Sequence, residues 1–275
     1  MSGKDLVART RRTTREGLTL LSAMREPRYR RLSRSYVLPG HAERVYCYHV
    51  RKTAGTSLHL SFLALGGEDP IEVQRRIERA ALHRTTSGRY AFVAHQRSLL
   101  DQGHYFYGWS HLPAHRLSLP PRTFTVTILR DPVDRVLSYY SYLRQGDAPD
   151  MAFPVGELER ALTARGFGAF LDVLPRPHLL AQLFMFSRTF DVSAATERIL
   201  ACSSVLFTEE YDAGLSSLGR RLSLALEARR DRASVPDTAV PAAEYERLRD
   251  LLDPEYRMLA DVRQALGQLG RSDAR

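Results

Sequence analysis

The fold of this chain is decided at residues 45–57, which read Val45-Tyr46-Cys47-Tyr48-His49-Val50-Arg51-Lys52-Thr53-Ala54-Gly55-Thr56-Ser57. The first six residues are mostly β-branched or aromatic, which predicts a buried strand. Small and hydroxyl-bearing residues follow, and residues 57–65 then show the apolar spacing of a helix that ends at Gly66-Gly67. The sequence therefore predicts a strand, a tight loop and a helix in direct succession.

The same alternation continues along the chain. Further strands are predicted at 90–94, 123–129 and 205–208. Helices are predicted at 71–83, 132–144, 155–190 (interrupted near Pro175 and Pro177), 212–230 and 241–268. Residues 101–121 contain several Pro, Gly and His residues and are interpreted as a loop. This order predicts one α/β domain over residues 44–275, with a mostly parallel sheet between helices in a P-loop-like, three-layer arrangement.

Composition restricts the partners of the protein. The 275 residues are 44% hydrophobic, which suffices for a large core, and the formal net charge is +9. A basic protein favours anionic partners, such as nucleic acid, an acidic membrane surface or a phosphorylated small molecule. Residues 1–43 are rich in Arg and Ser and are interpreted as a basic arm, either solvated or in peripheral contact with an acidic surface.

Two cysteines, Cys47 and Cys202, each lie in an apolar run, so reduced buried thiols are expected and no disulfide framework is. No metal-ligand spacing is visible, and we expect no metal. The sequence has no apolar run of the roughly 20 residues that cross a bilayer. The short patch at residues 17–24 does not have the features of a secretory signal. A cytoplasmic enzyme is the resulting expectation.

The loop at residues 51–57 has the chemistry of an anion site. A helix N-terminus offers free backbone N–H groups and the positive end of a dipole. Gly55 allows close approach of an anion, Lys52 adds a point charge, and hydroxyls come from Thr53, Thr56 and Ser57. The nucleotide-triphosphatase motif Gly-x-x-x-x-Gly-Lys-Ser/Thr is absent, because the lysine precedes the glycine here.

The string His49-Val50-Arg51-Lys52-Thr53-Ala54-Gly55-Thr56-Ser57-Leu58 closely resembles the "PKTAGTS" signature of the carbohydrate sulfotransferase family that includes the heparan sulfate 2-O-sulfotransferases. The resemblance implies that residues 51–57 bind the 5′-phosphosulfate of 3′-phosphoadenosine-5′-phosphosulfate (PAPS). Arg51 departs from the family's proline, which removes a stiff turn residue and adds a charge.

A second segment, running from Thr127 to Arg144, is similar to the family's 3′-phosphate signature. The resemblance implies that Arg130, at the end of a strand, and Ser138, on the following helix, both bind the 3′-phosphate. Seven helical steps from Asp131 to Ser138 rise about 10 Å, so a long arginine side chain can meet the serine at one anion. Weaker likenesses occur at residues 178–184 and 205–211.

The resemblance implies transfer of the sulfuryl group of PAPS to a hydroxyl of an acceptor. This reaction needs a base with a pKa near neutrality to remove the hydroxyl proton, which points to histidine. His95 ends a predicted strand, and residues 94–101 resemble the family block "GHVSFLDF", whose histidine is catalytic. We therefore assign His95 as general base, with His104, His111 and His115 as competitors and His49 as structural. Lys52 is expected to offset the charge that develops on the leaving phosphate.

Several interpretations stay open at this point. The aromatic residues Tyr105, Phe106, Tyr107 and Trp109 form either an acceptor-binding wall or packing for a loop. The hydroxyl-bearing acceptor is possibly a carbohydrate. The alternatives to a sulfotransferase are a P-loop-type small-molecule kinase, a basic nucleic-acid-binding protein and a family member that binds nucleotide without catalysis. Interspersed basic residues, with no stripe of alternating basic and aromatic side chains, disfavour nucleic acid.

Overall fold

The computed structural model describes residues 26–144, 161, 163, 165–229 and 240–272. Within them lies a six-stranded sheet with the strand order β2-β3-β4-β1-β5-β6. All neighbouring strands are parallel except β2 and β3, which form an antiparallel pair. The strands are β1 (Arg44–Tyr48), β2 (Arg84–Ser87), β3 (Tyr90–Ala94), β4 (Tyr107–Ser110), β5 (Thr123–Leu129) and β6 (Ser204–Phe207). The predicted α/β class with a mostly parallel sheet is confirmed.

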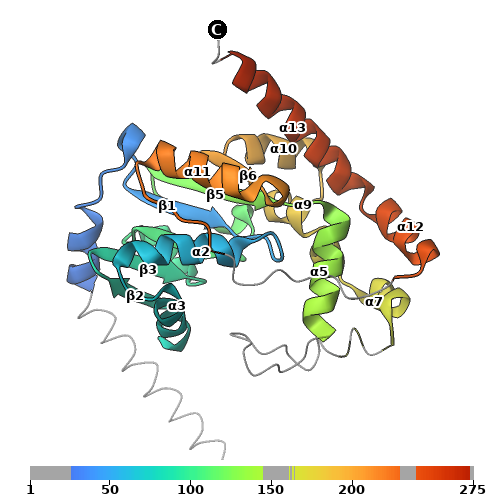
Figure 1. Ribbon diagram of the computed structural model, residues 1–275, viewed down its shortest axis with the longest axis horizontal. Helices are drawn as coiled ribbons and strands as arrows, with labels where there is room; N and C mark the ends of the chain where they lie inside the picture. Colours follow the sequence, from blue (N-terminus) through green and yellow to red (C-terminus); the bar gives the residue numbers. More distant parts are fainter. Residues whose placement is uncertain (1–25, 145–160, 162, 164, 230–239, 273–275) are drawn as a thin grey trace, which may run out of the picture.

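Helices cover both faces of the sheet, as the ribbon shows (Figure 1). One face packs on α2 (Gly55–Leu63), α3 (Pro70–Arg79) and α11 (Tyr211–Leu222). The other face packs on α4 (Arg97–Gln102), α9 (Ala181–Phe186) and α10 (Val192–Leu200). Alternation along β1 produces this arrangement, because Val45 and Cys47 enter the first core cluster and Tyr46 enters the cluster of the opposite face.

Beyond the edge of the sheet, further helices extend the second core. They are α5 (Pro132–Arg144), α7 (Phe167–Val173), α8 (Arg176–Leu179), α12 (Ala242–Leu251) and α13 (Asp253–Ser272). At their centre Arg135 is fully buried and faces the buried carboxylate of Glu255, with 3.7 Å between Nε and Oε2. The Arg135 guanidinium also donates to the carbonyls of His178 and Leu179, so this pair ties α5 and α13 to α8.

Most predicted elements appear in the structure, with boundaries shifted by a few residues. The predicted helices at 71–83, 212–230 and 241–268 correspond to α3, α11 and the pair α12–α13. The prediction at 155–190 falls partly outside the described residues, and its remainder holds the three short helices α7, α8 and α9, separated near Pro175 and Leu180. Pro175 precedes α8, as its lack of an N–H donor favours.

The interpretation of residues 101–121 as a loop is wrong at its centre. Tyr107–Ser110 form β4, which lies between β3 and β1 in the middle of the sheet. Four aromatic side chains of this stretch, Tyr105, Phe106, Tyr107 and Trp109, are at most 4% exposed. They are core residues, so the alternative of an acceptor-binding wall is also wrong.

The predicted basic arm overlaps a packed segment. Residues 26–33 are helical, and Tyr29, Tyr36, Leu38 and Ala42 are buried. The hydroxyl of Tyr36 accepts from the N–H of Ala91 and donates to the Arg89 carbonyl. Residues 26–43 therefore pack as part of the domain, whereas residues 1–25 lie outside the described residues.

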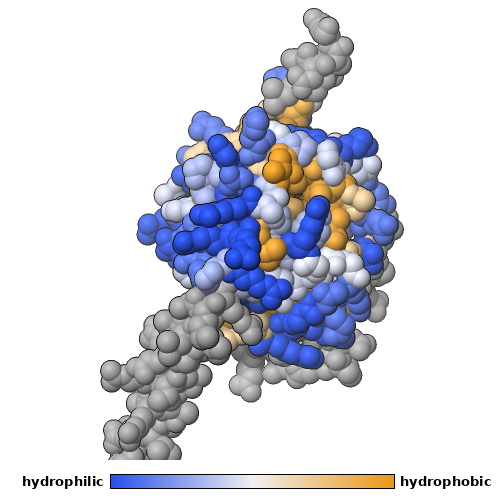
Figure 2. Space-filling view, turned by 90° about the vertical axis from the view of Figure 1, so that its left-hand side faces the viewer, coloured by the Kyte–Doolittle hydropathy of each residue, from blue (hydrophilic) through white to orange (hydrophobic). Residues whose placement is uncertain are grey.

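The helices that the structure describes include none with the length and apolar character needed for a bilayer crossing. Figure 2 looks onto the side of the molecule where residues 26–43 lie, and hydrophilic side chains cover most of that face beside a smaller apolar patch.

Candidate functional site

The predicted anion loop lies at the carboxyl end of β1, where the chain crosses from Tyr48 to the start of α2. Helix α2 has no side-chain cap at its N-terminus, and Ala54 takes a left-handed conformation there. The first intrahelical bond runs from Leu58 N–H to the Ala54 carbonyl, at 3.2 Å. The backbone N–H groups of residues 55–57 precede that bond, so they are available donors for an anion.

The loop backbone is strained at two positions. Lys52 and Ala54 both have positive φ, at 69° and 62°. Such conformations cost energy in non-glycine residues and can turn successive N–H groups toward one concave point. Thr53 stabilises the loop, since its fully buried hydroxyl donates to the Val50 carbonyl at 2.9 Å. Of the three predicted hydroxyl donors, only Thr56 and Ser57 are half-exposed.

Gly55 is required by a neighbouring ring. A Cβ at this position would lie 2.0 Å from Cδ2 and 2.1 Å from Nε2 of His49. The glycine was predicted from the sequence as a place where an anion approaches the backbone. In the structure the imidazole of His49 already occupies the space beside its Cα, so only glycine fits.

Arg130 meets the loop, as its predicted role requires. It follows β5, which pairs with β1 in parallel, so both strands end on the same edge of the sheet. The Arg130 guanidinium donates to the Lys52 carbonyl at 3.2 Å. Gln182 holds the Arg130 backbone on both sides, accepting from its N–H at 2.8 Å and donating to its carbonyl at 2.9 Å.

Helix α5 supplies the opposite wall of the loop. The ammonium of Lys52 lies 4.5 Å from the centre of the Tyr142 ring, a cation–π contact. Ser138 is one helical turn before Tyr142 on the same side of α5. Its side chain is fully buried, which is the observation least favourable to a direct contact with a phosphate.

His95 stands at the carboxyl end of β3, two strands from β1. Its φ is +59°, and its N–H donates to the Trp109 carbonyl at 2.9 Å. The half-buried imidazole has its pKa lowered to about 4, chiefly by burial and further by His83 and Arg51. His95 is therefore neutral near pH 7, the form in which a general base accepts a proton, but its pKa lies below the near-neutral value expected from the sequence, because burial disfavours the protonated ring.

A row of histidines joins the loop to His95. The ring of His111 lies between them, with centroids 4.4 Å from His49 and 5.3 Å from His95. Beneath the loop His49 Nδ1 is 2.9 Å from His59 Nε2, and His59 Nδ1 is 2.7 Å from the Tyr107 hydroxyl. Burial lowers the pKa of His49 and His59 well below the usual value, so the inner rings are neutral.

The sequence did not single out this row. His49 was interpreted as structural and His111 only as a competitor, because their spacing of 62 residues carries no local signal. Their local sequence did contain one hint: His49 and His111 each follow a run of apolar or aromatic residues, which is where the end of a strand is expected. His104 and His115 lie outside the row, since His104 binds Glu26 and His115 packs against Phe184. Within the described residues no three His, Cys, Asp or Glu side chains gather as a metal site would require.

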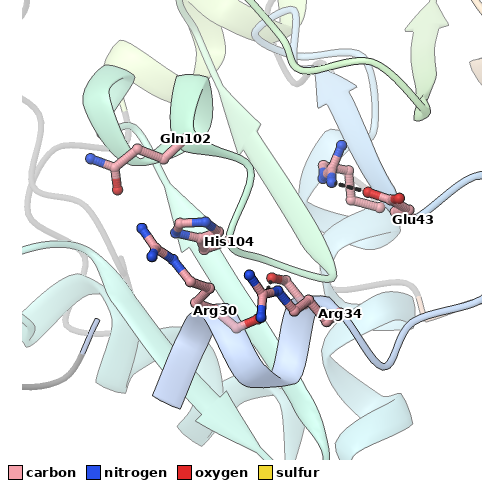
Figure 3. A pocket seen from close by; sticks show the side chains of 7 residues that line it. Arg30, Arg34, Glu43, Gln102 and His104 are labelled. Carbon is pink, nitrogen blue, oxygen red and sulfur yellow. Dashed lines mark hydrogen bonds and ion pairs between the residues drawn. The ribbon is translucent and has the colours of Figure 1, made fainter. Parts of the chain in front are cut away.

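A polar pocket of about 430 Å³ occupies the other end of the sheet. Figure 3 shows Arg30, from the helix of residues 26–33, and Arg34, just after that helix, beside His104 and Gln102. Arg44 lines it too, and its guanidinium is held by the carbonyls of Gly103 and Pro121 and by Glu43. No residue assigned to the predicted site lines this pocket.

No family model matches the chain, and no curated protein matches it. The geometry of the site and the resemblance of its two phosphate segments are the observations that bear on function.

Proposed function

We propose that this protein is a sulfotransferase that moves the sulfuryl group of PAPS to a hydroxyl of a carbohydrate or other small acceptor. One observation carries the proposal: the Arg130 guanidinium touches the Lys52 carbonyl. Two segments 78 residues apart, each resembling one phosphate-binding signature, thus meet on one edge of the sheet. Ligands of parallel α/β sheets bind at this edge, beyond the carboxyl ends of the strands.

The residues present suit the two ends of such a donor. The 5′-phosphosulfate is assigned to the backbone N–H groups of residues 55–57, with Lys52, Thr56 and Ser57 around it. The 3′-phosphate is assigned to Arg130, whose planar donors fit an anion of this shape. Ser138 belongs to the same assignment on the resemblance alone, and contact with it requires the side chains that cover its hydroxyl to move.

His95 is assigned as the general base. Neighbouring strands lie about 4.8 Å apart, so the ends of β1 and β3 are separated by about 10 Å. That span accommodates a phosphosulfate on the loop and an acceptor hydroxyl beside the neutral imidazole of His95. The base removes the hydroxyl proton while the acceptor oxygen attacks sulfur in line with the departing phosphate oxygen.

Lys52 and the loop dipoles are assigned to stabilise the negative charge on that departing oxygen. A sulfuryl group carries less charge than a phosphoryl group, so the proposal calls for no metal. It also places the reaction in the cytoplasm, where Cys47 and Cys202 would remain the free thiols seen here. Contact of the basic N-terminal residues with an acidic membrane surface is part of the same proposal.

A thermal-shift panel with 3′,5′-bisphosphoadenosine, Mg-ATP, NAD and duplex DNA tests the class of ligand. A ligand at one hundred times its Kd stabilises the folded state by about 2.7 kcal/mol. We expect stabilisation by the bisphosphate alone, and a much smaller shift in Lys52→Ala. Preference for Mg-ATP would overturn the proposal in favour of a kinase. A salt-sensitive shift with DNA and none with the bisphosphate would favour nucleic-acid binding.

A further inference from the structure

The imidazole of His111 has a fixed hydrogen-bonding direction. Its Nδ1 lies 2.9 Å from the carbonyl oxygen of His49. A carbonyl oxygen can only accept, so Nδ1 of His111 must carry the hydrogen. Burial lowers the pKa of His111 to about 3, which leaves the ring neutral near pH 7. In a neutral imidazole the second nitrogen is then bare, so Nε2 of His111 can only accept a hydrogen bond.

His95 is the neighbouring group that such an acceptor can orient. Among the described residues the imidazole of His95 forms no hydrogen bond, and its ring centroid is 5.3 Å from that of His111. Two imidazoles joined by a straight N–H···N bond have centroids about 5 Å apart, from an N···N distance of about 3 Å plus both ring radii. The observed separation of the two rings matches that of such a bond, and the 34° tilt between them is the change that rotation of the His95 side chain would have to remove.

We propose that His111 is a positioning residue that holds His95 in the tautomer able to act as the base, an inference that rests on the proposed function. The ring nitrogen of His95 that faces His111 carries the hydrogen and donates it to Nε2 of His111. The other nitrogen of His95 is bare and faces the acceptor. The hydrogen bonds from the His49 carbonyl through His111 to His95 thus form a relay in which one group orients the ring of the general base.

The reaction step balances with this arrangement. The acceptor oxygen forms a bond to sulfur, and its proton passes to the bare nitrogen of His95. The bond from sulfur to the phosphate oxygen breaks, and its electron pair leaves with that oxygen. His95 becomes an imidazolium, and its hydrogen bond to His111 strengthens because the donor is now charged.

A purely structural role for His111 makes a different prediction. Among the described residues, the side chain of His111 forms one hydrogen bond, from Nδ1 to the backbone carbonyl of His49. An asparagine amide places its NH₂ near the position of Nδ1, whereas a glutamine amide reaches the position of Nε2. His111→Asn therefore keeps the structural bond, and His111→Gln keeps the proposed acceptor.

Turnover of the two variants separates these roles. We expect kcat of His111→Gln to stay within a few fold of wild type and kcat of His111→Asn to fall by about 10- to 100-fold, as for other orienting partners. KM for the donor should change little in both. The opposite order, with Asn better than Gln, would overturn the proposal. The matched control is His104, whose Nδ1 binds Glu26 at the other end of the sheet. His104→Asn and His104→Gln should leave kcat unchanged.

A spectroscopic readout tests the proposal without turnover. Histidine ¹⁵N spectra report which ring nitrogen carries hydrogen. We expect His95 to hold one tautomer in wild type and in His111→Gln, and to become a mixture in His111→Asn. Identical His95 spectra in all three proteins would overturn the role of His111. If the spectra change as expected but neither bisphosphate binding nor sulfuryl transfer is found, the proposed function fails while the orientation of His95 by His111 stands.

Discussion

The basic side chains at the two ends of the central sheet differ in their interaction partners. At the amino end Arg44 pairs with Glu43 at 2.5 Å, and Arg122, just before β5, pairs with the same carboxylate at 3.0 Å. At the carboxyl end the row of histidines stands beside Arg51, and Arg130 forms no ion pair within the described residues. The charges of the first end are paired inside the fold, whereas Arg130 at the second end donates to a backbone carbonyl, and the proposed function assigns an anion to it.

This contrast supports the carboxyl end as the site of the proposed reaction. Paired cations that donate to backbone carbonyls, as Arg44 does, hold segments together. Neutral imidazoles beside cations and a strained loop cost stability, and such features gather where a ligand supplies what is missing. Substitutions at the amino end should therefore change stability, and those at the carboxyl end should change binding and rate.

The largest effect is expected from His95. In His95→Ala the general base is lost, and kcat should fall by about 10²- to 10⁴-fold. His95→Asn is the better-matched variant, because asparagine tolerates the φ of +59°. Binding of 3′,5′-bisphosphoadenosine, measured by calorimetry, should persist in both. His104→Ala at the amino end is the control, and a near wild-type rate for His95→Asn would remove His95 from the mechanism.

Arg44 should give the next largest effect, on stability alone. In Arg44→Met the carbonyls of Gly103 and Pro121 lose a charged donor, and each such bond is worth about 1.5 kcal/mol. We expect the free energy of unfolding to fall by about 3 kcal/mol in urea titrations. The rate per folded molecule should not change. A fall in kcat with unchanged stability would break the distinction between the two ends.

Gly55→Ala tests whether His49 dictates the loop. Alanine is normally the better helix residue by about 1 kcal/mol. Here its Cβ would lie 2.0 Å from the His49 ring, so we expect destabilisation by about 1–3 kcal/mol and weaker binding of the bisphosphate. The double variant Gly55→Ala/His49→Ala should recover stability relative to Gly55→Ala. An increase in stability in Gly55→Ala would show that the His49 ring moves aside at little cost, which would contradict the prediction.

Arg51→Ala should produce the smallest effect, on pH dependence. Arg51 lowers the pKa of His95, so its removal should raise that pKa above about 4. Because the base works only when neutral, activity is full above this pKa and is lost as pH falls through it. The acid limb of kcat/KM should therefore move to higher pH. The shift should stay under about one unit, because solvent screens the exposed Arg51. An NMR titration of His95 checks the same shift without turnover, and a downward shift would contradict the sign.

The elements with strong local patterns could be predicted from the sequence. The strand at 123–129 was predicted with the boundaries that β5 has, because seven consecutive β-forming residues leave little choice. Strand β4 was missed, since four residues with a glycine inside a stretch of Pro and His do not show a strand signal. Its central place depends on pairing with β3 on one side and β1 on the other, both distant in sequence.

The candidate site divides in the same way. The loop, Arg130 and His95 each follow a recognisable strand, so their common edge could be predicted. Gln182, which clamps the Arg130 backbone, and His111, which lies beside His95, depend on contacts across 52 and 16 residues. The residues next to Gln182 and His111 in the sequence do not indicate that Arg130 and His95 are their partners.

The strand–loop–helix unit at residues 45–57 and the strongly patterned strands and helices around it follow from the chemistry of neighbouring residues, whereas β2 and β4 do not. Contacts between distant segments place the His49 ring beside Gly55 and bring four histidines into a row from the loop to β3, and the Thr53 hydroxyl closes the loop. The physical reason is that parallel strands bring their carboxyl ends together whatever their distance along the chain, so neighbours at that edge are set by packing.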